Sequence, residues 1–285
     1  MNVISGLPVA WCALISGSVA LLLFWLKEFG KVLDTFTKVL GLVMILLTLY
    51  IAISSNPPII DALTNSIAPE KIDTLAIVTL VGGTVGGYIS FAGAHRLLDA
   101  GIKGAENLNQ VTRSAVSGIV ITGVMRTVLF LAVLGVVAGG VVLDKQNPAA
   151  SVFQAAAGDI GYRFFGVVMW CAAITSVVGC AYTSVSFLRS LHPFIEKFQR
   201  SFISAFIIIS TLLYVWIGNP VKLLVSAGAI NGLILPIALS VILIASGKKL
   251  LLGSYAHPIW MQIFGWLVVA GMAWMSIYTI INWLS

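Results

Sequence analysis

Eight long apolar segments run through this 285-residue chain, and they leave few folds open to it. A segment of about 20 apolar residues is long enough to cross the hydrocarbon core of a bilayer as a helix. The sequence therefore predicts an all-α membrane protein, with eight transmembrane helices in a single polytopic domain spanning residues 1–285. We expect these helices at residues 9–26, 36–54, 75–98, 115–137, 164–188, 202–217, 223–246 and 259–284.

The composition excludes an ordinary soluble protein. Hydrophobic residues make up 59% of the chain and charged residues 9%, whereas a soluble domain carries about 25% charged residues. The loops contain no nucleotide-binding motif, catalytic triad spacing or cluster of metal ligands, so we expect neither an enzyme nor a bound cofactor. The net charge of +6 arises from basic residues in short loops, which indicates orientation in a membrane rather than binding to nucleic acid.

Lysine and arginine are divided unequally between the two sets of loops, and this predicts the orientation. The odd-numbered loops hold eleven of them: Lys27, Lys31, Lys38, Arg96, Lys103, Arg113, Arg189, Lys197, Arg200, Lys248 and Lys249. The even-numbered loops hold four: Lys71, Lys145, Arg163 and Lys222. Cytoplasmic loops are enriched in basic residues. We therefore expect a multi-pass protein of the cell (inner) membrane, with the odd-numbered loops in the cytoplasm and both termini on the outer side.

The third segment contains the glycine-rich run Gly82–Gly87. Each glycine costs about 1 kcal/mol of helix propensity relative to alanine. Non-helical backbone persists in a membrane only against protein or a wet cavity, and secondary transporters bind substrates at such broken helices. We therefore expect a break over Gly82–Gly87. The alternative is close packing of continuous helices through the small residues Gly83 and Gly87.

Polar groups near this expected break are candidates for binding a substrate. A half-helix that resumes near Ile89 would point its positive end at an anion, whereas carbonyls that end the first half-helix would suit a cation. The candidate substrate-binding residues are Thr84, Val85, Gly86, Tyr88 and Arg126.

Arg126 is a charged residue in the middle of a predicted membrane helix. Such a charge costs a few kcal/mol, so it should face the interior of the bundle or a cavity. It would serve as a counter-ion for the substrate or replace a coupling cation. The alternative is a structural role, with the guanidinium snorkelling or bonded to backbone carbonyls.

His95 and Asp99 lie one helical turn apart, after the glycine run. This pair could relay protons or bind a metal. The alternative is a hydrogen bond that only anchors the end of the helix.

Two stretches resemble the NRAMP family of divalent-metal ion transporters. Leu80–Val85, followed by a break, resembles that family's sixth helix. Leu233–Leu239 with its Leu-Pro-x-Ala core, and Ser246–Gly253 with its Ser-x-Lys-Lys-x-x-Gly pattern, are similar to the tenth helix and the following loop. The similarity covers nearly the whole chain as the family's fourth to eleventh helices. It implies a LeuT-type inverted-repeat bundle that is incomplete at the N-terminus.

The resemblance also implies a transport function, but it leaves the identity of the metal open. Family members are proton-coupled symporters of metal ions, but their methionine ligand falls on Gly86 and a glutamine of the tenth helix on Gly228. The metal therefore stays unknown, and the remaining donors are a carbonyl of Val85 or Gly86 and two hydroxyls. The alternatives are a LeuT-type carrier for a small organic acid or amino acid, or a truncated protein that does not transport. Expected partners are the lipid bilayer and the metal ion or organic solute. A separate chain that supplies the missing helices is a further partner, unless the protein is truncated.

Overall fold

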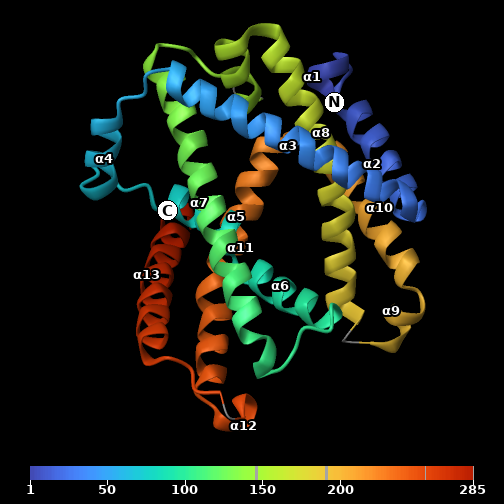
Figure 1. The fold of residues 1–285 in the computed structure, drawn as a ribbon, viewed down its shortest axis with the longest axis vertical. Coiled ribbons are helices and arrows are strands. Elements are labelled where there is room, and N and C mark those ends of the chain that lie inside the picture. Colours follow the sequence, from blue (N-terminus) through green and yellow to red (C-terminus); the bar gives the residue numbers. More distant parts are fainter. Residues whose placement is uncertain (145–146, 190–191, 254, 285) are drawn as a thin grey trace. The chain divides into compact units, whose positions relative to one another are not determined.

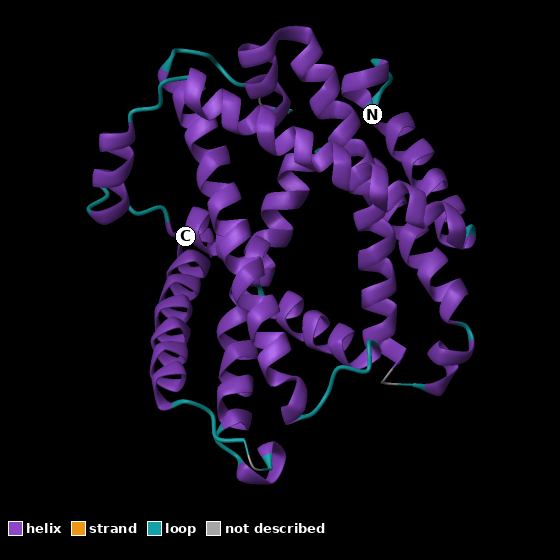
Figure 2. Ribbon diagram, in the orientation of Figure 1, coloured by secondary structure: helices purple, strands orange, loops and turns teal. Residues whose placement is uncertain are grey.

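A computed structural model describes residues 1–144, 147–189, 192–253 and 255–284, without the side chains of residues 27–37, 89 and 282–284. The described residues form helices joined by short loops, with no strand (Figure 2), which confirms the all-α prediction for this part of the chain. The helices are α1 (Asn2–Ser5), α2 (Val9–Trp25), α3 (Lys27–Ser54), α4 (Ile59–Ile67), α5 (Thr74–Val85), α6 (Gly87–Asp99), η1 (Ala105–Asn107), α7 (Leu108–Ala138), α8 (Pro148–Arg189), α9 (Pro193–Lys197), α10 (Gln199–Ile217), α11 (Pro220–Ser246), α12 (Lys249–Leu252) and α13 (Ile259–Leu284).

The chain divides into two compact units (helix labels in Figure 1). The first unit comprises Met1–Pro69 and Gln110–Pro220, and the second comprises Glu70–Asn109 and Val221–Ser285. The first unit thus contains α1–α4 and α7–α10, and the second contains α5, α6 and α11–α13. The expectation of a single transmembrane domain stays a prediction.

The first unit is held together by α8, which packs against α2, α3 and α10. Ile174 of α8 lies in one apolar cluster with Ala20 of α2 and Ile207 of α10. The helix is 42 residues long and bends at Gly158, whose φ of 62° and ψ of −158° are non-helical. The predicted span 164–188 is therefore only the part of α8 after the bend.

The second unit has a core where α5, α11 and α13 meet. Val78, Leu235 and Met272 are buried there together. Helices α5 and α11 approach so closely that a Cβ atom on Gly82 would lie 2.7 Å from the Cα atom of Gly232. Glycine at these positions is therefore required by the close approach of two helices, which is the use of small residues common between membrane helices.

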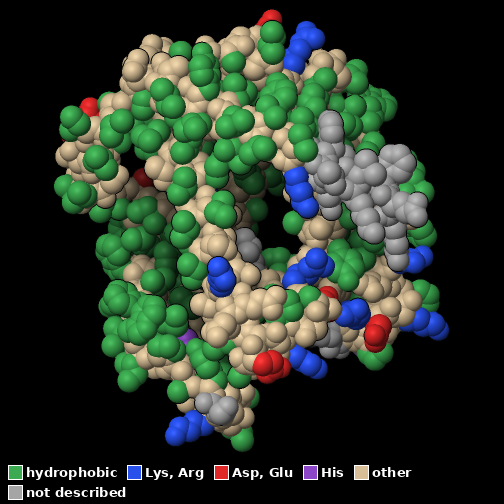
Figure 3. All heavy atoms as spheres, viewed as in Figure 1, with side chains coloured by type: hydrophobic (Ala, Val, Ile, Leu, Met, Phe, Trp, Pro, Cys, Tyr) green, Lys and Arg blue, Asp and Glu red, His purple; other side chains and the backbone are tan. Residues whose placement is uncertain are grey.

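Six of the described helical segments are long and apolar enough to cross a membrane, and a seventh is possible if α3 and α4 together form one span. The six are Thr74–Asp99, Ala105–Ala138, Pro148–Arg189, Gln199–Ile217, Pro220–Ser246 and Ile259–Ile281. The predicted number of eight is not confirmed. The first predicted span is a 17-residue apolar helix, Val9–Trp25, and the second leads into a sharp bend. Hydrophobic side chains cover much of the visible face, as expected for contact with lipid (Figure 3).

Candidate functional site

The predicted break in the third apolar segment is present but narrower than expected. Helix α5 continues to Val85 and α6 begins at Gly87, so only Gly86, with φ −56° and ψ 161°, leaves the helical conformation. The prediction that the whole of Gly82–Gly87 is non-helical is wrong. Gly82 lies within helix α5, and the close contact with α11 explains why this residue is a glycine. That part of the run fits the alternative of close helix packing.

The side chain of Asn231 on α11 bridges the break. Its amide nitrogen Nδ2 donates to the carbonyl of Gly82 at 2.7 Å, and its oxygen Oδ1 accepts from the N–H of Tyr88 at 3.0 Å. In an unbroken helix the Gly82 carbonyl would accept from Gly86, and Tyr88 would donate to the Thr84 carbonyl. The carboxamide therefore replaces two hydrogen bonds that the break removes, which is how a membrane protein keeps irregular backbone satisfied.

Asn231 also explains why residue 86 is a glycine. A Cβ atom built on Gly86 would collide with Nδ2 and Cγ of Asn231 and would lie 2.5 Å from the Gly82 carbonyl oxygen. The carboxamide thus occupies the space that a side chain at position 86 would need. A methionine at this position, the residue that the family resemblance places there, cannot be accommodated without displacing Asn231.

The other predicted donors at the break differ in their availability. The carbonyl of Gly86 accepts from the N–H of Ser90 at 3.2 Å and from the hydroxyl of Ser90 at 3.3 Å. The hydroxyl of Thr84 donates to the carbonyl of Leu80, which leaves its oxygen lone pairs as acceptors. Tyr88 and Val85 are exposed. The break therefore presents oxygen donors, and Ser90 already bonds to the carbonyl of Gly86.

Groups of three or more His, Cys, Asp or Glu side chains that could hold a metal ion do not occur among the described residues. The oxygens present at the break are those of carbonyl, carboxamide and hydroxyl groups. Such hard ligands suit Mg²⁺, Ca²⁺ and Mn²⁺ better than softer ions.

The structure brings His95 and Asp99 together on α6. Nε2 of His95 lies 3.7 Å from Oδ1 of Asp99, and the two side chains are 16% and 15% exposed. The pair is an ion pair when the imidazole is protonated, so the geometry is compatible with both the proton relay and the anchoring role.

Arg126 is exposed on α7, in the first unit, whereas the break belongs to the second. Arg126 and the break thus belong to different units. Its assignment to the substrate site stays a prediction. Lys145, which the charge pattern assigns to an outside loop, lies outside the described residues.

Sequence reasoning missed Asn231, although one signal was available. It is the single asparagine or glutamine in the 27 residues of α11. A lone carboxamide in a membrane helix needs a hydrogen-bonding partner. Gly228, where the resemblance expects a glutamine ligand, instead packs against Thr79 of α5: a Cβ atom there would lie 2.9 Å from the Thr79 carbonyl oxygen.

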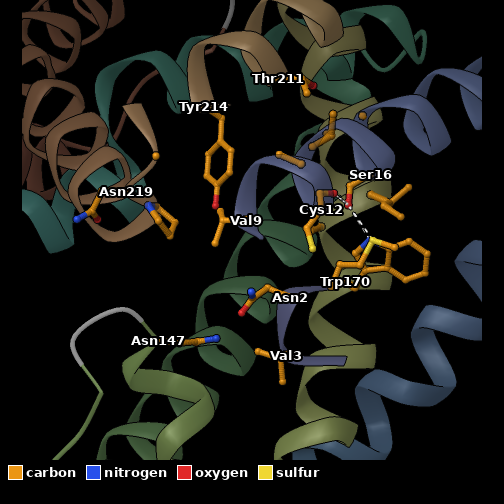
Figure 4. A pocket seen from close by; sticks show the side chains of 18 of the residues that line it. Asn2, Val3, Val9, Cys12, Ser16, Asn147, Trp170, Thr211, Tyr214 and Asn219 are labelled. Carbon is orange, nitrogen blue, oxygen red and sulfur yellow. Dashed lines mark hydrogen bonds between the residues drawn. The ribbon is translucent and has the colours of Figure 1, made fainter. Parts of the chain in front are cut away.

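A separate cavity of about 740 Å³ lies in the first unit, among α1, α2, α8 and α10 (Figure 4). Its lining includes Trp170, whose Nε1–H donates to the hydroxyl of Ser16 at 2.9 Å, and Tyr214. None of the predicted site residues lines this cavity. It is therefore not the site that the sequence predicted.

Several apolar helices long enough to span a bilayer, one of them broken and bridged by a neighbour, define a multi-pass membrane protein. The profile of the Nramp family, described as natural resistance-associated macrophage protein-like, matches residues 1–282. The chain belongs to the Nramp family of membrane transporters.

Two membrane proteins are similar to this chain over nearly its whole length. The chain is 57% identical over 280 residues to a Bacillus subtilis (strain 168) protein named "Uncharacterized membrane protein YcsG", a match that covers 98% of this chain and 69% of the relative. It is 51% identical over 285 residues to a membrane protein of Haemophilus influenzae, covering 100% of this chain and 72% of that relative.

Proposed function

We propose that this chain contributes the substrate site of a proton-coupled divalent-metal transporter, with the ion bound at the break between α5 and α6. One observation supports this most: the helix is broken at a single non-helical residue, Gly86, and the Asn231 carboxamide bridges the break from the Gly82 carbonyl to the Tyr88 N–H. Membership of the Nramp family supports the class of function.

The proposed ligands are all oxygens. They are Oδ1 of Asn231, which retains a second lone pair beside its bond to Tyr88, the carbonyl of Val85, and the hydroxyls of Thr84 and Tyr88. Because the carboxamide fills the space of a side chain at position 86, an oxygen donor takes the place of the family's thioether. Thioethers favour soft metals, whereas carbonyl and carboxamide oxygens favour hard ones. The transporter should therefore discriminate weakly among divalent cations.

His95 and Asp99 form the proposed proton relay. Nε2 of His95 and Oδ1 of Asp99 are 3.7 Å apart, so a small movement of either side chain would bring them to hydrogen-bond distance. Histidine is the side chain that most readily changes protonation near neutral pH.

The fold and orientation complete the proposal. We propose a LeuT-type inverted-repeat bundle in the inner membrane, with the odd-numbered loops in the cytoplasm and both termini outside. The basic residues of the loops support the orientation. The match covers 69% and 72% of the two relatives. In this proposal, a separate chain supplies the helices that complete the first repeat.

Uptake of Mn²⁺ into proteoliposomes tests the function, with the chain purified alone and with any segment that co-purifies. We expect an inward proton gradient to drive uptake, and excess Mg²⁺ or Ca²⁺ to suppress it.

Asn231→Ala should raise the KM for Mn²⁺ about tenfold, which corresponds to the loss of one ligand interaction of roughly 1.4 kcal/mol. The matched control is Asn107→Ala, since the Asn107 carboxamide only donates to the carbonyl of Lys103 in a loop. Strong selectivity for Cd²⁺ or Mn²⁺ over Mg²⁺ would contradict the proposed ligand set.

The alternative function is transport of a small organic acid or amino acid. Helix α6 begins at the break and is 13 residues long, so its positive end favours an anionic group there. Arg126 would supply the counter-ion. Organic-acid uptake that is abolished by Arg126→Gln and unaffected by divalent cations would favour this alternative. If neither the chain alone nor the chain with a co-purifying segment transports a solute, the non-transporting alternative holds.

A further inference from the structure

Helix α4 follows α3 after a sharp turn that sequence reasoning read only as a loop. The segments Lys38–Ser54 and Ile59–Ile67 make an angle of 100°. The turn contains Asn56, whose φ of 46° is in the left-handed region, followed by Pro57 and Pro58, which cannot continue a helix. Helix α4 therefore runs nearly perpendicular to the apolar helix that precedes it (Figure 1).

The two sides of α4 differ in polarity. At 100° per residue, its four large apolar side chains fall within one arc of about 100°. These are Ile59, Ile60, Leu63 and Ile67. The remaining arc carries Asp61, Thr64, Asn65 and Ser66. The helix is thus amphipathic.

The apolar side of α4 is uncovered by the rest of the described chain. Ile60 is 79% exposed, Leu63 61% and Ile67 87%. On the polar side, the side chains of Thr64 and Asn65 donate to carbonyls one turn back in the same helix, at 2.9 Å each. Nothing in these contacts removes the apolar arc from water, although its exposure is unfavourable.

We infer that α4 lies flat in the polar–apolar boundary of the membrane, with Ile60, Leu63 and Ile67 directed into the acyl chains. Lipid is the occupant that fits, because apolar side chains near the end of α3 are exposed too, with Ile53 69% exposed. The 100° bend also turns α4 parallel to the bilayer if α3 crosses it. An amphipathic helix in this position buries its apolar side at the interface.

The charge of α4 predicts how it binds. Asp61 is the single charged residue in the helix, which has no lysine or arginine. Amphipathic helices that depend on anionic lipids carry basic polar faces. The contact of α4 with the membrane should therefore depend on apolar burial and not on lipid charge.

Fluorescence of single labelled cysteines tests this inference. The chain is placed in a Cys180→Ser background, with Cys12 and Cys171 buried, and an environment-sensitive dye is attached at Ile60→Cys, Leu63→Cys or Ile67→Cys. The matched controls are Thr64→Cys and Asn65→Cys on the opposite side of the same helix. Each protein is reconstituted into vesicles of neutral lipid, with or without lipids brominated on the acyl chain, and iodide is used as the water-soluble quencher.

We expect the three apolar positions to show blue-shifted emission that brominated lipid quenches and iodide does not, and the two controls to show the reverse. Adding anionic lipid should leave this pattern unchanged. Quenching by iodide at all five positions would show that the apolar side faces water and would overturn the inference. Blue-shifted emission that neither quencher reaches would show that protein, from the second unit or a second subunit, covers α4, and would also overturn it.

Discussion

Asn231 satisfies two of the backbone groups that the break frees, one carbonyl and one N–H, and it does so with one side chain. Its carboxamide is among the few side-chain groups that can donate and accept at the same time, and it uses both capacities, toward Gly82 and Tyr88. Leaving a buried polar group without a partner costs about 1–3 kcal/mol. This residue was not predicted, because its role depends on a contact between α5 and α11 that no local pattern shows.

The stability of the chain should depend on Asn231. Replacing it with alanine leaves the buried Gly82 carbonyl without its donor, so the free energy of unfolding should fall by about 1–3 kcal/mol. Equilibrium unfolding in detergent, followed by circular dichroism, measures this. The control Asn107→Ala should change stability by less than about 0.5 kcal/mol. Equal effects of the two variants would mean that the bridge contributes nothing to stability.

Gly83 and Gly86 offer a paired test on neighbouring positions. A Cβ atom on Gly86 collides with Asn231, whereas nothing lies within 4 Å of a Cβ atom on Gly83. Gly86→Ala should destabilise the protein by about 1–3 kcal/mol, as overpacking does. Gly83→Ala should be neutral or stabilise helix α5 by up to about 1 kcal/mol. The same unfolding measurement decides, and a stabilising Gly86→Ala would contradict the described geometry.

At the scale of the element, hydropathy and glycine content predicted the apolar helices and the segment that contains the break. They could not predict its extent, because glycine serves two purposes in the run Gly82–Gly87: a close helix contact at Gly82 and a conformational break at Gly86. They also missed α4, since hydropathy records that a segment is apolar and not that it bends at Asn56. The broken helix was therefore predictable from local composition, but the group that bridges it was not.

The His95–Asp99 pair on α6 permits a test of proton coupling. His95→Gln keeps a polar side chain but removes the imidazole that the proposed relay needs. Stimulation of Mn²⁺ uptake by an inward proton gradient should be lost, while uptake driven by the Mn²⁺ gradient alone continues. His257→Gln, which alters a histidine paired with Tyr255 in a loop, is the control. Full stimulation in His95→Gln would leave only the anchoring role for this pair.

At the scale of the whole molecule, family membership gives the class of protein, and the unequal loop charges predict its orientation in the membrane. The family match covers residues 1–282 and establishes the class of protein, whereas the eleven and four basic residues of the two loop sets predict only its orientation. The division of the chain into two compact units was not predictable from hydropathy, because an apolar pattern does not specify which helices pack together.

Lys103 and Lys249 should be cytoplasmic, and the C-terminus should be outside. Single cysteines at these positions, in a chain without Cys12, Cys171 and Cys180, are exposed to an impermeant thiol reagent on intact and on permeabilised cells. Cysteines in place of Lys103 and Lys249 should react only after permeabilisation, and one at the C-terminus should react in intact cells. Reaction at position 103 in intact cells would refute the orientation.

The central claim is that oxygens at the Gly86 break bind the transported ion, and an anomalous diffraction map of the Mn²⁺-soaked protein tests it most directly. We predict a manganese peak at the break, within coordinating distance of Oδ1 of Asn231 and the carbonyl of Val85, that both excess Mg²⁺ and the Asn231→Ala substitution weaken. A peak away from the break, or one at the break that persists unchanged in Asn231→Ala, would contradict the account.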